Sequence, residues 1–355
     1  MKNMSTLPII DVQMVLLQAV FINFSSIKQF CKTISCCLKG RGGTVMTKSW
    51  CELLLPFNPK VSHVEELHST YIANCVFNSF LSFTAILLNI ITIHAIRKTS
   101  SLPKPLRTLL LSLAVSDLGV GLFVQPFYIS LLAKWLQHSI PNCTTFKVFS
   151  LVEVVLTAAS FFGVVAVTVD RFLAIHLHLR YQELVTHKRV LALTISIWVL
   201  SVLISLTSLW VSPAIRALFL GIIFFGVLLA LTVLYIRIYL VVRRHNNEIQ
   251  ALHDQVQQAD EMTNFAGIVK TAVGVFYVYL VFLFCYPPYF ISLAAITIVG
   301  PSDLLKRLFF FSSTLVYLNS SLNPIIYCWK MRHIRHVVME ILPNRINWLR
   351  NPSSQ

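Results

Sequence analysis

Long runs of residues almost free of charge constrain this chain more than any other feature. Seven such runs follow one another, and only Asp117 and Glu153 interrupt them: 72–96, 108–133, 148–169, 190–215, 217–236, 271–301 and 308–329. A helix that crosses a bilayer needs about 20 apolar residues, whereas a membrane β-strand needs about ten of alternating polarity. The sequence therefore predicts an all-α membrane protein, a seven-transmembrane helix bundle.

Composition excludes the two main alternatives. Of the 355 residues, 56% are hydrophobic and 12% are charged. Soluble domains carry about 25% charged residues, and disordered chains combine low hydrophobicity with high charge. A soluble enzyme and a disordered chain are both excluded by these values.

The formal net charge of +15 reports topology. Lys and Arg gather in the connections after the first, third, fifth and seventh runs, and these connections are cytoplasmic by the positive-inside rule. The chain is then a multi-pass plasma-membrane protein with its N-terminus outside and its C-terminus inside. Its basic residues face the lipid headgroups, and we expect no nucleic acid partner.

Residues 1–70 are predicted to be an extracellular tail, followed by a membrane domain over 71–328. The segment 12–27 leaves open a signal sequence or an extra helix, because it is uncharged but short and polar. Glycosylation sequons at Asn3, Asn23 and Asn142 lie on the outer side. The outer location allows disulfides, and a bond between Cys143 and a cysteine of this tail is one pairing that it permits. Residues 329–355 begin with an amphipathic pattern typical of a helix on the inner leaflet.

Ordered motifs in the runs resemble the rhodopsin-like (class A) G protein-coupled receptors. They span about residues 71–336 and comprise Asn89, Leu113-Ala114-x-x-Asp117, Asp170-Arg171-Phe172, Trp198, Phe282-x-x-Cys285-Tyr286-x-Pro288 and Asn319-Ser320-x-x-Asn323-Pro324-Ile325-Ile326-Tyr327. Phe172 and Tyr286 depart from the family's Tyr and Trp. The resemblance implies a receptor for an extracellular diffusible ligand, with a heterotrimeric G protein as its partner.

The resemblance also assigns residues to activation: Asp170, Arg171, Tyr235, Tyr286, Pro288, Asn323, Pro324 and Tyr327. Asp170 can hold its neighbour Arg171 while the cytoplasmic face is closed. The two prolines remove backbone hydrogen bonds and are predicted to kink their helices. Many relatives lock the Arg to a Glu on span six, where this chain has Ile268 with Lys270 close by. We therefore expect raised basal signalling.

A sodium pocket is implied at five positions, namely Asp117, Ser160, Asn319, Ser320 and Asn323. Oxygen-bearing side chains around one carboxylate suit a hard cation. A neutral hydrogen-bonded cluster is the alternative. We expect no resident cofactor beyond such an allosteric Na⁺.

The ligand is predicted to bind near Glu153, Tyr286, Tyr289, Phe290 and Tyr317. Glu153 stands where amine receptors carry an Asp, and aromatic faces can hold a cation. A cationic amine is therefore slightly favoured, and the alternative is a Glu153 without a ligand role.

Other features favour other branches of the family. The short connection 209–214 has no Cys and span five has no Pro, as in melanocortin receptors, whereas the span-two run 120–127 is similar to a group that includes adenosine receptors. The subfamily stays open.

Other function classes fit less well. A non-signalling or decoy seven-helix receptor is the main alternative. A transporter or channel is more distant, because the chain has no inverted repeat and no filter sequence. A retinal protein would need a Lys where Tyr317 stands. No phosphate loop, zinc-ligand set or nucleophile elbow indicates an enzyme.

Overall fold

The computed structural model describes residues 64–99, 102–139, 142–177, 180–211, 213–251, 259–331 and 334–340. The chain divides into two units, Met1–Leu53 and Leu54–Gln355, and all described residues belong to the second. The predictions for the tail, including segment 12–27, Asn3 and Asn23, lie outside the described residues.

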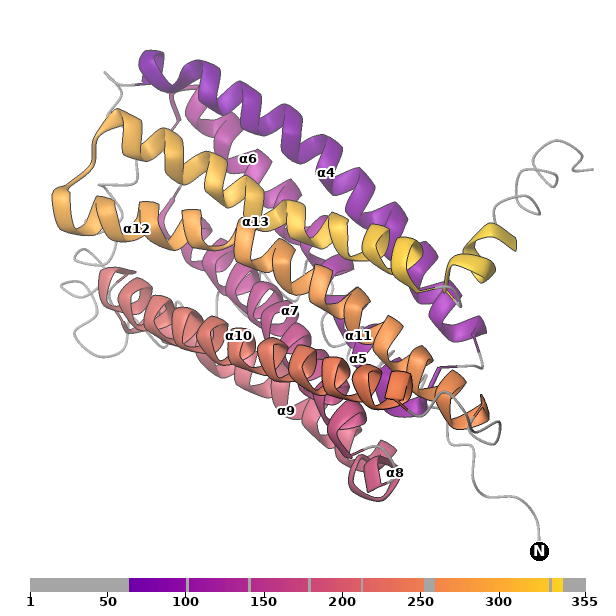
Figure 1. The fold of residues 1–355 in the computed structure, drawn as a ribbon. Helices are drawn as coiled ribbons and strands as arrows, with labels where there is room; N and C mark the ends of the chain where they lie inside the picture. The colour runs from indigo at the N-terminus through magenta and orange to yellow at the C-terminus, as the bar shows by residue number, and fades with distance from the viewer. Residues whose placement is uncertain are drawn as a thin grey trace, which may run out of the picture. The chain divides into compact units, whose positions relative to one another are not determined.

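The described residues form helices that run back and forth along one bundle (Figure 1). In chain order these are α4 (Val64–Lys98), α5 (Lys104–Gly119) with η2 (Val120–Val124) and α6 (Gln125–Leu136), α7 (Cys143–Leu177), the short α8 (Tyr181–Leu184), α9 (His187–Leu206) with η4 (Thr207–Leu209), α10 (Pro213–Ala251), α11 (Ala259–Cys285), α12 (Pro287–Val299) and α13 (Asp303–Lys330). The described part contains no strand. The predicted all-α bundle is confirmed.

Within the described residues, six helical stretches are long and apolar enough to cross a membrane. They are Glu66–Lys98, Lys104–Leu136, Cys143–Leu177, His187–Leu209, Ile215–Arg244 and Thr271–Val299. The seventh helix, α13, is less apolar because it packs against α4, α11 and α12 and buries many polar side chains there. These are Ser312, Ser313, Thr314, Asn319, Ser320, Ser321 and Asn323.

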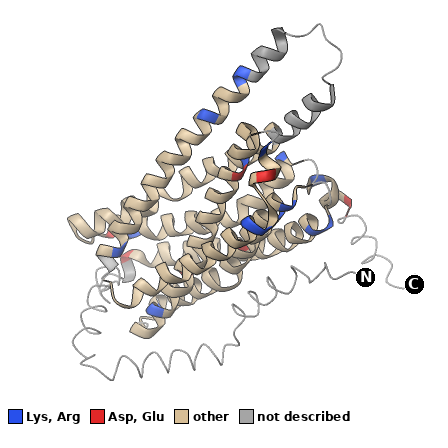
Figure 2. Ribbon diagram, turned by 90° about the horizontal axis from the view of Figure 1, so that it is seen from below, with Lys and Arg blue, Asp and Glu red and all other residues tan. Residues whose placement is uncertain are grey.

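Apolar side chains cover the outside of the bundle. On α4, Phe80 and Phe83 are each 64% exposed, and Phe219 on α10 is 63% exposed. Water would disfavour such a surface, whereas lipid accepts it. Lys and Arg are sparse along the helices and stand mostly near their ends (Figure 2).

Two prolines free backbone carbonyls that α4 then satisfies. Pro324 lies inside α13 and has no N–H for the Ser320 carbonyl, and the Asn89 side chain donates to that oxygen at 2.9 Å. Pro126 follows the π-helical turn η2, in which a residue bonds to the fifth residue before it, and Pro126 has no N–H for the Gly121 carbonyl. Ser82 donates to that oxygen at 2.8 Å. Asn89 is therefore a helix-to-helix hydrogen-bond donor.

The charge-free runs do not coincide with the helices, in agreement with the connection predicted at 209–214 and the kink predicted at Pro288, and one predicted boundary was wrong. The run to residue 215 joins two elements, because η4 ends at Leu209 and α10 begins at Pro213, a residue suited to a helix start. The run to residue 301 is broken at Tyr286, because Pro287 and Pro288 cannot continue the hydrogen bonds of α11. The last helix begins later than predicted, since α13 continues to Lys330 and residues 334–340 form the next helical segment.

Candidate functional site

Two ends of the bundle hold the predicted site residues. The end with Glu153 is called the Glu153 end, and the opposite end of α7, with Asp170 and Arg171, is called the Arg171 end. Because α7 packs against α5, α9, α10 and α11, its side chains reach most of the interior.

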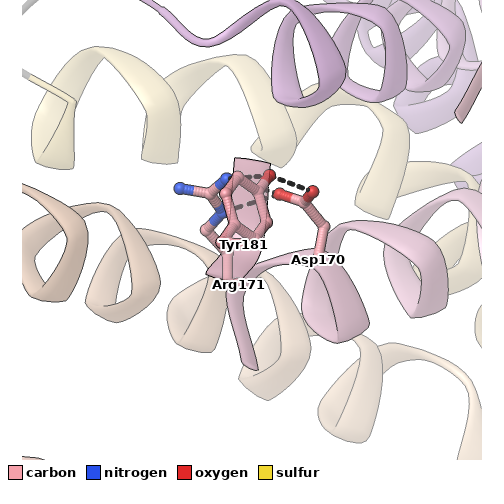
Figure 3. Close-up of polar contacts among 3 residues, drawn as sticks. All are labelled: Asp170, Arg171 and Tyr181. Atoms are coloured by element: carbon pink, nitrogen blue, oxygen red, sulfur yellow. Dashed lines mark hydrogen bonds and ion pairs between the residues drawn. The ribbon is translucent and has the colours of Figure 1, made fainter. Parts of the chain in front are cut away.

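The Arg171 cluster consists of Asp170, Arg171 and Tyr181 (Figure 3). Arg171 forms a salt bridge with Asp170, in which its Nε donates to Asp170 Oδ2 at 2.9 Å. Tyr181, from α8, donates its hydroxyl to the other oxygen, Asp170 Oδ1, at 2.6 Å. Both charged side chains are at most 4% exposed. The predicted Asp170–Arg171 contact is present, and Tyr181 is a partner that the sequence did not reveal.

Tyr181 is suited to remain a donor in this cluster. Burial raises the pKa of its hydroxyl, and the adjacent Asp170 carboxylate raises that pKa further. The phenol therefore keeps its proton at neutral pH. The Asp170 carboxylate accepts hydrogen bonds at both oxygens, which is the condition under which a buried ion pair is stable.

Tyr235 and Tyr327 lie in the next layer of the interior and are both buried. The Tyr235 hydroxyl lies 3.1 Å from the Thr168 hydroxyl. The Tyr327 hydroxyl has no hydrogen-bond partner in the described part of the chain. Among the described residues, neither tyrosine forms a hydrogen bond with Arg171.

The Asp117 cluster brings together the residues predicted to form a sodium pocket. Ser160 donates to Asp117 Oδ1 at 2.9 Å, and Asn323 donates to Oδ2 at 2.8 Å. The Ser320 side chain also lies beside this carboxylate. Among described residues, the Asn319 side chain and the Asn323 Oδ1 have no hydrogen-bond partner although they are buried. Buried polar atoms of this kind are normally satisfied.

An aromatic layer separates the Asp117 cluster from the Glu153 end. Tyr286, at the break between α11 and α12, stacks on Phe282 with ring centroids 4.7 Å apart and on Phe224 at 5.4 Å. Phe224 in turn stacks on Phe290 at 4.7 Å. The layer joins α10, α11 and α12 at the point where Pro287 and Pro288 separate α11 from α12.

The Glu153 site brings the other predicted ligand residues together. Tyr317 on α13 donates its hydroxyl to Glu153 Oε1 at 2.6 Å. The ring of Tyr317 packs edge-on against Tyr128 at 5.3 Å, and Tyr289 packs edge-on against Phe290 at 5.4 Å. Glu153 is half-buried. Its carboxyl group lies beside the aromatic side chains of Tyr317 and Tyr128.

Two residues of this region were missed by the sequence analysis. Phe224 on α10 is buried in the aromatic layer, whereas Phe219 on the same helix is 63% exposed. Arg216 lies in the first turn of α10 and interacts electrostatically with both Glu153 and Tyr289. In the sequence, Arg216 stands alone between the apolar runs 190–215 and 217–236, and this position was the signal available.

Cys143 is disulfide-bonded, whereas Cys75, Cys285 and Cys328 are free. Its bonding partner lies outside the described residues. The side chains of Ile268 and Lys270, on which the expectation of raised basal signalling depends, also lie outside them.

Comparison with known proteins gives one family. The family model described as "7 transmembrane receptor (rhodopsin family)" matches residues 88–214 and 209–327. Adenosine receptor A2b of Gallus gallus is 29% identical over 316 residues, covering 78% of this chain and 89% of the relative. Melanocortin receptor 3 of Homo sapiens is 28% identical over 323 residues, covering 87% and 96%. The mixed subfamily features of the sequence are reproduced in these two relatives.

Proposed function

Because the chain belongs to the rhodopsin family of seven-transmembrane receptors, we propose that it binds an extracellular ligand at the Glu153 end and activates a heterotrimeric G protein at the Arg171 end. The membrane would be the plasma membrane, with the N-terminus outside. Support for this orientation comes from the basic residues near the Arg171 end, such as Arg107, Arg189 and Arg243.

The Arg171 cluster is the observation that carries this proposal. Arg171 is buried against Asp170 and Tyr181, so a G protein cannot reach it until the helix ends separate. The break at Tyr286–Pro288 provides a hinge between the ligand end and the inner half of α11. A ligand that favours a bent arrangement at this hinge would shift the equilibrium toward release of Arg171.

A cell assay of G protein activation tests the proposal. Wild type, Arg171→Ala and the control Arg189→Ala would be expressed at matched surface levels. We expect a signal in wild type and in the control, and its loss in Arg171→Ala. A signal that survives Arg171→Ala would contradict the assigned role. Silence of all three across amines, purines and peptides would favour a non-signalling receptor.

For the ligand, we propose a cationic amine held at Glu153. The Glu153 carboxyl group accepts from Tyr317, and the rings of Tyr289 and Phe290 stand nearby. A carboxylate beside aromatic faces suits an ammonium group. Glu153→Gln should then weaken an amine agonist about tenfold or more, the effect of losing one charged hydrogen bond. An unchanged dose–response curve would exclude this contact.

We also propose that the Asp117 cluster binds Na⁺. The carboxylate and the unpartnered amide oxygens of Asn319 and Asn323 offer the hard oxygen ligands that such an ion needs. Bound Na⁺ would add stability to the form that binds it. Purified receptor should therefore unfold at a higher temperature in NaCl than in choline chloride, and Asp117→Asn should abolish the difference. Equal unfolding of the wild type in both salts would favour the neutral cluster.

A further inference from the structure

The Glu153 site contains a second charge of the opposite sign. Arg216 on α10 donates to Ser208 of η4, and Ser205, just before η4, donates to the Leu151 carbonyl of α7, two residues from Glu153. The opposite charges of Arg216 and Glu153 therefore lie close enough to attract each other, with Tyr289 of α12 beside them. With Tyr317 on α13, four helices contribute one polar group each. The site is therefore bipolar, although the sequence predicted only its acidic half.

The two charges do not form an ion pair with each other. Glu153 bonds through its carboxyl group to Tyr317, and Arg216 donates to Ser208 of η4. Among the described residues, no salt bridge joins Glu153 to Arg216 directly. Half-buried opposite charges that attract each other without a direct bridge leave part of their desolvation cost uncompensated in a site of low polarity. A ligand that supplies both missing partners would remove that cost.

A ligand with a single charge fits this site poorly. An ammonium group attracted by Glu153 is repelled by Arg216, and an anion attracted by Arg216 is repelled by Glu153. Arg can also hold a carboxylate through two parallel hydrogen bonds. We propose that the physiological ligand is zwitterionic, with its ammonium at Glu153, its carboxylate or another anionic group at Arg216, and an apolar body against the aromatic layer.

This inference rests on the ligand site of the proposed function and adds the second contact. Phe224, Tyr286 and Phe290 stack together, and Phe224 and Tyr286 also contact Phe161, which lies two turns further along α7 than Glu153. An aromatic or large apolar group between the two charges would bury its surface there. The expected class is an aromatic amino acid or a small derivative that keeps both charges.

Three probes with one ring system separate the charges: tyrosine, tyramine without the carboxylate, and 3-(4-hydroxyphenyl)propanoate without the amine. Binding is measured as the rise in unfolding temperature of the purified full chain, a readout that needs no G protein. We expect tyrosine to stabilise the wild type at a concentration about tenfold lower than either analogue, since each charged contact contributes about that factor.

Variants assign each charge to its residue. Arg216→Met should remove the preference for tyrosine over tyramine, whereas Arg216→Lys should keep part of it. Glu153→Gln should remove the preference over the propanoate, and Arg189→Met, remote from the site, should change nothing.

Two outcomes overturn the proposal. If tyramine stabilises the wild type at the same concentration as tyrosine, and Arg216→Met has no effect, then the anionic contact is excluded. The amine proposal would still stand. No stabilisation by any probe at millimolar concentration would reject both ligand proposals. In either case the Arg171→Ala signalling assay still decides separately whether the chain is a signalling receptor.

Discussion

The two ends of α7 treat charge in opposite ways. At the Arg171 end, Asp170 and Arg171 are buried together, and Tyr181 completes the shell of the carboxylate. At the Glu153 end, Glu153 and Arg216 are near each other but are bonded to neutral partners instead. The first arrangement is a direct ion pair completed within the protein, whereas the second leaves two opposite charges without a direct bridge.

This difference indicates that the Arg171 end stabilises the closed state and that the Glu153 end is suited to bind a ligand. A buried ion pair with its hydrogen bonds complete resists opening, because separating the charges exposes an uncompensated one. An incompletely paired site gains most from an added molecule. We infer that the Arg171 cluster stabilises the closed state. Ligand binding at the Glu153 site then supplies the free energy that opens it.

The largest expected effect is on stability. Asp170→Asn leaves Arg171 buried without a counter-charge and should destabilise the chain by about 3 kcal/mol. Glu153→Gln keeps a partner for Tyr317 and relieves an unpaired charge, so it should change stability by less than about 1 kcal/mol. Thermal unfolding of both purified variants without ligand measures the contrast. Equal losses in the two variants would refute the proposed difference between the ends.

A smaller effect is expected from Tyr181→Phe. This change removes one hydrogen bond to a carboxylate, worth roughly 1.5 kcal/mol or more, and leaves the ring in place. Basal G protein signalling should rise about tenfold because the closed state loses that energy. Tyr239→Phe is the matched control, since Tyr239 on α10 is 61% exposed. A rise of the same size in both variants would show that the Tyr181 hydroxyl has no special role.

The smallest effect concerns the contact between α11 and α13. The Lys330 ammonium lies 4.2 Å from the ring centroid of Tyr277 on α11 and 3.5 Å from that of Trp329. Cation–π contacts contribute about 0.5–1 kcal/mol at exposed positions. Lys330→Met should therefore raise basal signalling about two- to fivefold, and Lys330→Arg should retain the wild-type level. A basal level in Lys330→Met equal to that of wild type would exclude this contact as a restraint on α11.

Most of the architecture was predictable because apolar run length alone decides which segments cross a bilayer. Run length alone does not mark the helix ends before Pro213 and Pro287, where a run of apolar residues continues although the helix does not, and only the prolines predicted these ends. Hydropathy does not report a missing N–H. Pro126 and Pro324 also leave backbone carbonyls free. The side chains that donate to these carbonyls, Ser82 and Asn89, belong to a helix distant in sequence from both prolines and could not be identified by spacing.

The sequence by itself determined the helical membrane class, the family motifs and the neighbours Asp170 and Arg171, since these depend on composition or on adjacent residues. Only the tertiary structure decided that Tyr181 completes the Asp170 shell, that Phe224 enters the aromatic layer and that Arg216 lies near Glu153. These contacts join separate helices, and the side chain that faces a given neighbour depends on helix rotation and packing. Neither quantity can be read from a uniformly apolar run.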